Sequence, residues 1–168
     1  MSYLRHRIIL SYAVLVILFD QATKWLVNDN IPFYDSIAVT FFFNLVHLRN
    51  YGAAFGVFNN PEGTWQFWFF LASTLLAMVI IYFVAKGARE RDKTLFTGLG
   101  LIMGGAIGNF IDRIRFNSVV DFLDFHWAGF HWPAFNVADT AICIGVGLTT
   151  IVLVFSPPPR EEGSGDAG

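Results

Sequence analysis

Two aspartates differ from the other acids of the chain in their surroundings. Asp121 lies within the apolar run Val119-Val120-Asp121-Phe122, and Asp139 stands at the start of a long apolar segment. A carboxyl group in apolar surroundings has a raised pKa, and a second carboxylate nearby raises one of the two further. Two acids that share one proton can activate water and polarise a scissile carbonyl. We therefore interpret Asp121 and Asp139 as a candidate pair for peptide-bond hydrolysis.

Several acids within residues 108–139 also have purely structural interpretations. Asp124 is three residues beyond Asp121 and is an alternative member of the pair, although a solvated loop acid is the more ordinary interpretation. Asn136 and Asp139 have the spacing of a helix N-cap residue and an acid in the first turn, which would be purely structural. Asp112 next to Arg113 is typical of an acid–arginine pair that fixes a helix end, so we interpret both as scaffold.

Metal and thiol chemistry find little support in the sequence. His126 and His131 are five residues apart, which is not a zinc-protease spacing, and each precedes a tryptophan, a pairing typical of headgroup depth in a membrane. No Gly-x-Ser-x-Gly elbow accompanies any serine. Cys143 is the single cysteine and lies in an apolar run, so we expect a buried structural thiol. We predict no metal and no other cofactor.

The composition indicates which elements must position these residues. Hydrophobic residues make up 55% of the chain and charged residues only 14%, whereas soluble proteins carry about 25% charged residues. This predicts an α-helical integral membrane protein, and no basic run suggests nucleic acid. We expect membrane-spanning helices at about 8–27, 67–84, 95–111 and 136–155, because these segments are apolar and close to the length that crosses a bilayer.

Between the first two helices, the region of about 31–50 alternates β-branched and aromatic residues with period two. That pattern predicts a small extracytoplasmic β-sheet lying against lipid. We thus expect one membrane domain over residues 1–156, followed by a disordered cytoplasmic tail over 157–168. Asp20 and Lys24 stand at i, i+4 near the end of the first helix and are expected to pair.

Small residues and charges predict how the helices pack and point. Gly100, Gly104 and Gly108 recur every four residues, which indicates close helix packing in lipid. Lysine and arginine are concentrated at the N-terminus and in the 86–93 loop. The positive-inside rule therefore places both termini in the cytoplasm and the acidic cluster on the opposite face.

Five motifs, in this order along the chain, resemble those of the lipoprotein signal peptidase family, also called signal peptidase II. They are Asp20-Gln-x-x-Lys24, Asn50-x-Gly-Ala-Ala-Phe55, Gly108-Asn-x-x-Asp-Arg113, Val119-Val-Asp-Phe122 and Phe135-Asn-x-Ala-Asp139. The resemblance spans roughly residues 8–155. One departure is Tyr51, where many members of the family carry a smaller residue.

The resemblance implies an aspartic endopeptidase of the bacterial inner membrane, with its active site at the periplasmic face. Such enzymes remove signal peptides from prolipoproteins by cleaving before a cysteine that carries diacylglycerol, so the implied partners are lipidated prolipoproteins and membrane lipid. It implies Asp121 and Asp139 as the catalytic dyad. Residues implied to hold the substrate or the dyad are Asn50, Gly52, Asn109, Arg113 and Asn136, with Asp20 and Asp112 supporting them.

Two other classes of function remain as alternatives. A small proton channel or transporter could use the same acids as a relay, but they cluster near one membrane face instead of crossing the midplane. A non-catalytic assembly subunit would account for the glycine rows and would leave the acidic cluster unexplained.

Overall fold

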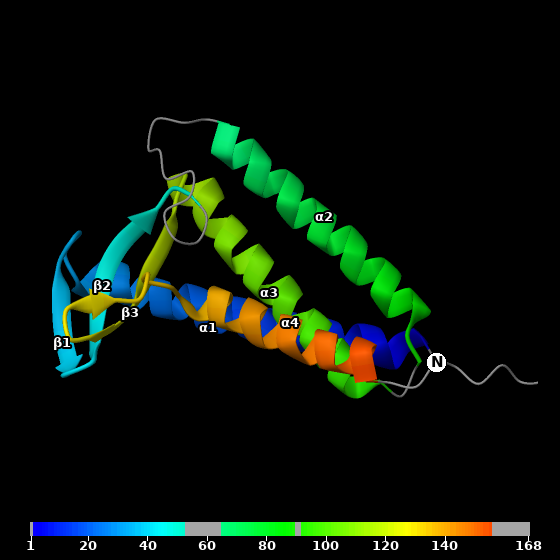
Figure 1. Cartoon of the computed structure of the whole chain (residues 1–168). Coiled ribbons are helices and arrows are strands. Elements are labelled where there is room, and N and C mark those ends of the chain that lie inside the picture. Colours follow the sequence, from blue (N-terminus) through cyan, green and yellow to red (C-terminus); the bar gives the residue numbers. More distant parts are fainter. Residues whose placement is uncertain (1, 53–64, 90–91, 156–168) are drawn as a thin grey trace, which may run out of the picture.

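Four long helices and a small sheet make up the fold in a computed structural model that describes residues 2–52, 65–89 and 92–155 (Figure 1). The helices are α1 (Ser2–Asn30), α2 (Trp65–Gly87), α3 (Lys93–Phe116) and α4 (Val137–Phe155). All four are long and apolar enough to cross a membrane. The predicted tail over 157–168 and the motif residues 53–55 lie outside the described residues.

The sheet forms at one end of the helices and combines two separate parts of the chain. Its strand order is β1 (Ser36–Thr40), β2 (Phe43–Asn50), β3 (Val119–Trp127) and β4 (Phe130–His131), with every neighbouring pair antiparallel. The sheet predicted between the first two helices therefore also recruits β3 and β4, which lie between α3 and α4. Since Asn50 pairs with Val119, the end of β2 lies beside the start of the strand that carries Asp121.

Helix α3 packs against the three other helices, and its glycines permit the close approach. A Cβ on Gly104 would lie 2.7 Å from the backbone oxygen of Ala13 in α1, and one on Gly108 would meet the Asp20 carboxylate. The predicted packing role of this row is therefore correct. A second glycine row on α3, which was not predicted, faces α4: a Cβ on Gly98 would collide with Thr149 and the Gly145 backbone oxygen, and one on Gly105 would collide with the Ala138 backbone oxygen.

Helices α1 and α3 extend beyond their predicted ends at the sheet end. The prediction ended α3 at residue 111 because the apolar run stops there, but Asp112 and Arg113 turn inward and the helix continues. It ends at Phe116, and the C-cap residue Asn117 adopts a left-handed conformation (φ 54°) and donates its backbone N–H to Arg113 O. α1 continues past residue 27, where Asn28 Nδ2 donates to Lys24 O at 2.8 Å.

Candidate active site

Asp121 is held on β3 by two asparagine amides. It is 3% exposed. Asn50, at the end of β2, donates through Nδ2 to Asp121 Oδ2 at 3.0 Å, and Asn136 Nδ2 donates to Asp121 Oδ1 at 2.8 Å. Both carboxylate oxygens therefore have a fixed donor, and the orientation of the carboxyl group is set by residues from two other parts of the chain.

Asp139 lies in the first turn of α4 and closes a capping box with Asn136. The Asp139 backbone N–H donates to Asn136 Oδ1 at 2.9 Å, and the Asn136 N–H donates to Asp139 Oδ2 at 3.2 Å. The predicted capping role of Asn136 and Asp139 is thus confirmed. In addition, Asn109 Nδ2 donates to Asp139 Oδ1 at 2.7 Å, so the carboxylate also belongs to the polar cluster between α3 and α4.

Asn136 is the residue that brings the two aspartates together. It is fully buried, its Oδ1 caps α4, and its Nδ2 contacts Asp121. The same Nδ2 lies 3.2 Å from Asn109 Oδ1. The Asn136 side chain therefore both caps α4 and holds the Asp121 carboxyl group next to Asp139.

The proximity of the aspartates alters the acidity of Asp121. Burial, and to a lesser extent the negative charge of Asp139, raise the pKa of the Asp121 carboxyl to about 7, against opposing hydrogen bonds from Asn50 and Asn136. The Asp121 carboxyl is therefore still partly protonated at neutral pH, in a site that also contains the Asp139 carboxyl group.

Lys24 lies at the centre of a buried charge cluster behind the two aspartates. It is 2% exposed, and its Nζ lies 2.8 Å from Asp20 Oδ2, 3.0 Å from Asp112 Oδ2 and 2.9 Å from Asn109 Oδ1. The predicted Asp20–Lys24 pair is confirmed. The predicted partner of Asp112 is wrong, because Asp112 pairs with Lys24 and not with Arg113. The Lys24–Asp112 contact could not be predicted from the sequence, because the two residues are far apart in the chain and meet only through the packing of α1 against α3.

Asp20 and Asp112 also accept hydrogen bonds from backbone N–H groups that lie next to Asp139 and Asp121, respectively. Asp20 Oδ1 accepts the Ala138 N–H at 3.0 Å, at the positive end of α4. Asp112 Oδ2 accepts the Val120 N–H at 3.1 Å, next to Asp121 in β3. Asp20 therefore fixes the backbone next to Asp139, and Asp112 fixes the backbone next to Asp121.

Arg113 and Gly52 lie at the edge of the same site. Arg113 Nη2 donates to Gly52 O at 3.2 Å, and its guanidinium stacks over Phe70 of α2 at 3.7 Å. The Gly52 N–H donates to Asn50 Oδ1 at 2.9 Å. The charge of Arg113 is attracted by both Asp121 and Asp139, so it is part of the site and more than the scaffold inferred from its neighbour Asp112.

A cavity of about 660 Å³ opens in front of the two aspartates. Asp121, Asp139, Asn109 and Arg113 line its polar side. One further part of the lining comes from the end of β2 and its surroundings: Leu48, Arg49, Asn50, Gly52 and Val119. The opposite wall is mostly apolar and combines part of α4 with the segment that precedes it: Trp132, Pro133, Ala134, Phe135, Thr140, Ile142, Cys143 and Ile144. Such a space suits a substrate with one polar reacting group and an apolar body.

The structure also tests the other chemistry considered in the sequence, which involved Asp124, a metal site and Cys143. Asp124 does not line this cavity: it accepts from Asn44 Nδ2 at 2.9 Å and contacts His131 Nδ1 at 2.9 Å. Among the described residues, no group of three or more His, Cys, Asp or Glu side chains is placed to hold a metal. Cys143 is exposed and lines the cavity, so its predicted burial is wrong. The error arose because an apolar sequence does not distinguish a helix face in the core from one facing lipid or a cavity.

Comparisons with known proteins agree with this arrangement. The family model described as Signal peptidase (SPase) II matches residues 12–155. The lipoprotein signal peptidase of Nitratidesulfovibrio vulgaris is 51% identical over 96% of this chain and 98% of its own length, and that of Paraburkholderia phymatum is 48% identical over 92% and 90%. A solved bacterial membrane enzyme superposes with a TM-score of 0.78 at 33% identity, covering 94% of both chains. The chain is therefore a multi-pass bacterial membrane protein that belongs to the signal peptidase II family.

Proposed function

We propose that this protein is an aspartic endopeptidase that removes signal peptides from diacylglyceryl-modified prolipoproteins. The main observation behind the proposal is that two carboxyl groups, Asp121 on β3 and Asp139 on α4, line one cavity. Both form hydrogen bonds with Asn136. The names of its relatives support prolipoproteins as substrates. Cleavage would fall before the lipidated cysteine, as the motif resemblance implies.

In this mechanism the pair shares one proton. The raised pKa of Asp121 makes it the acid that polarises the scissile carbonyl, while the ionised Asp139 takes a proton from water as that water attacks. Collapse of the tetrahedral intermediate returns a proton to the leaving amine. Asn50, Asn109 and Asn136 keep both carboxyl groups in place throughout, because each donates to one or both of them.

The position of the cavity suits a substrate held in the membrane. Asp139 lies in the first turn of a helix that is long enough to span the bilayer, so the reaction takes place close to one end of the helices. A lipidated cysteine anchors its peptide at the same depth, and the apolar walls limit entry of competing water. With the helices oriented by their flanking positive charges in the inner membrane, both termini would be cytoplasmic and the site periplasmic.

The proposal is tested with purified protein and a synthetic prolipoprotein peptide, in which the cysteine either carries diacylglycerol or is unmodified. We expect cleavage directly before the modified cysteine, unchanged by a chelator, and little cleavage of the unmodified peptide. Equal cleavage of both peptides would contradict the substrate assignment. Loss of activity with the chelator would contradict the aspartic mechanism.

A further inference from the structure

Two arginines at the sheet end of the helices lie against the same aromatic ring. The guanidinium carbon of Arg49, at the end of β2, is 4.2 Å from the centre of the Phe116 ring. That of Arg115, in the last turn of α3, is 4.8 Å from the same centre. The negative end of α3 accounts for an arginine in its last turn, but not for a second one supplied by β2. We call Arg49 and Arg115 the arginine pair.

The charges of the arginine pair are not compensated by an acid nearby. Among the described residues, no carboxylate lies within ion-pair distance of either guanidinium. Arg49 Nη2 donates to Asn28 Oδ1 at 2.7 Å, whereas its Nη1 is buried without a hydrogen-bond partner in that part of the chain. Arg115 is exposed, and its hydrogen bond to Gln21 Oε1 is long at 3.5 Å. Both guanidinium groups therefore retain charge that a ligand could compensate.

The electrostatics at Arg49 favour an added negative charge. Burial lowers the pKa of its guanidinium, and the attraction of Asp112 and Tyr51 offsets only part of this effect. The positive charge of Arg115 lowers the same pKa, and Asp112 is already paired with Lys24. A carboxylate matches a guanidinium in both shape and charge. An acidic group placed beside the arginine pair would thus be attracted by both residues.

Arg49 also connects the arginine pair to the catalytic cavity. It lines that cavity together with Leu48 and Asn50, and Asn50 donates to Asp121. Adjacent residues of a strand point to opposite faces, so the Arg49 side chain lies on the side of β2 away from Asp121, toward the ends of α1 and α3. The arginine pair therefore lies at the edge of the cavity and away from the reacting bond.

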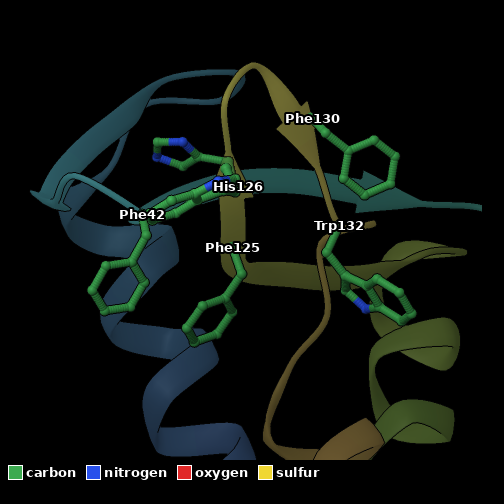
Figure 2. A pocket seen from close by; sticks show the side chains of 6 residues that line it. Phe42, Phe125, His126, Phe130 and Trp132 are labelled. Carbon is green, nitrogen blue, oxygen red and sulfur yellow. The ribbon is translucent and has the colours of Figure 1, made fainter.

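The two ends of the sheet offer a substrate different surroundings. Near the pairing of Phe43 with Phe125, aromatic rings that include Phe125 and Trp132 line a pocket of about 420 Å³ (Figure 2). At the other end, where Asn50 pairs with Val119, the arginine pair supplies charge. The apolar α4 wall suits the lipid chains and the signal peptide. A polar chain that follows the lipidated cysteine therefore leaves the cavity most favourably at the arginine end.

We infer that the arginine pair binds an acidic side chain of the substrate, about two to four residues after the lipidated cysteine. The inference rests on the proposed function, because it concerns the peptide that is cleaved at Asp121 and Asp139. An extended chain advances about 3.3 Å per residue, so a carboxylate at this spacing can pass from the reacting bond to the edge of β2. Since the arginine pair does not touch the reacting bond, it should alter KM more than kcat.

The test uses diacylglyceryl-modified peptides in an uncharged detergent. The peptides are identical except that the second, third or fourth residue after the cysteine is Asp, Asn or Lys. At one or more of these positions we expect KM to be about three- to tenfold lower for Asp than for Lys, with similar kcat. Equal KM values for Asp and Lys at all three positions would overturn the inference.

Substitutions separate recognition of the acid from a structural role of the arginines. Arg49→Gln combined with Arg115→Gln should give the same KM for the Asp, Asn and Lys peptides, and Arg49→Glu should favour Lys. Arg7→Gln is the matched control, because Arg7 also lies over an aromatic ring, Tyr3 at 5.6 Å, but near the other end of α1. It should keep the preference for Asp. A double variant that cleaved all peptides more slowly and still preferred Asp would show a structural role and overturn the inference.

A lipid headgroup is the other anion available at this depth. If the preference for Asp never appeared in detergent, while the double variant lost turnover of every peptide in phosphatidylglycerol vesicles, the arginine pair would bind lipid and the inference would be wrong. If no peptide is cleaved under any condition, the proposed function fails. The fluorescence anisotropy of labelled Asp and Lys peptides then decides the inference. Tighter binding of the Asp peptide, lost in the double variant, supports it, and equal binding of both peptides refutes it.

Discussion

Asn136 illustrates how much of the proposed site depends on single amide groups. Its Oδ1 accepts the first-turn N–H of Asp139, and its Nδ2 donates to Asp121 at 2.8 Å. The capping half of this role needs only a side-chain oxygen, which serine also supplies. The contact to Asp121 needs a donor with the reach of an amide. The two halves can therefore be separated by substitution.

We expect Asn136→Ser to keep most of the thermal stability of the protein and to lose nearly all activity. Asn136→Ala should lose activity and also about 1 kcal/mol of stability, because the cap is removed. Thermal unfolding in detergent and cleavage of the lipidated peptide measure the two effects. Full turnover in Asn136→Ser would show that the amide contact to Asp121 is dispensable.

The raised pKa of Asp121 predicts the pH dependence of the reaction. A pair that works with one shared proton fails when that proton is lost, so kcat/KM should fall as pH rises above about 7, the pKa of Asp121. Asn50 donates to the ionised carboxylate and lowers this pKa, so in Asn50→Ala the alkaline limb should move to higher pH. Profiles of both proteins on the lipidated peptide measure the shift. A limb that moved to lower pH would contradict the assignment of the shared proton to Asp121.

At the scale of the elements, Lys24 joins α1 to α3. Its single charge lies against two buried carboxylates, Asp20 and Asp112. Removing one partner of a buried ion pair leaves an uncompensated charge, which costs about 3 to 5 kcal/mol. We therefore expect Lys24→Met to be strongly destabilised. Adding Asp20→Asn and Asp112→Asn should recover part of the loss, because Asn retains an acceptor for Ala138 and Val120. Thermal unfolding of the single and triple variants tests this, and a triple variant less stable than Lys24→Met would refute the explanation.

The second glycine row predicts where α3 and α4 lie too close together to admit a side chain. A Cβ at Gly105 would collide with the backbone oxygen of Ala138, whereas one at Gly147 would meet nothing within 4 Å. Gly105→Ala should move the first turn of α4, with Asp139, away from Asn109 and reduce both stability and activity. Gly147→Ala is the matched control, and it should be neutral or slightly stabilising because alanine favours the helix. Unchanged unfolding and turnover in Gly105→Ala would contradict this account of the packing.

For the whole molecule, local sequence patterns predicted the helices and singled out two acids that the structure places on one cavity, but they did not predict the contacts between distant segments. The length of the apolar segments was sufficient to predict the four spans, and the apolar neighbours of Asp121 in the sequence were sufficient to predict its raised pKa. The contact of Lys24 with Asp112, the recruitment of β3 to the β1–β2 hairpin and the Asp124–His131 pair each depend on tertiary packing. None of them leaves a periodic or short-range signal in the chain. The three asparagines entered as candidates through motif resemblance, because an amide alone has no distinctive surroundings in a sequence.

The central claim is that Asp121 and Asp139 together activate one water molecule, and the most direct measurement is single-turnover cleavage of the diacylglyceryl-modified peptide by three variants. Asp121→Asn and Asp139→Asn should each lose at least about a thousandfold in rate, since neither acid can replace the other. Asp124→Asn, whose native side chain binds Asn44 and His131 outside the cavity, should remain active. If Asp124→Asn abolished cleavage while Asp121→Asn retained it, the assignment of the pair would be wrong.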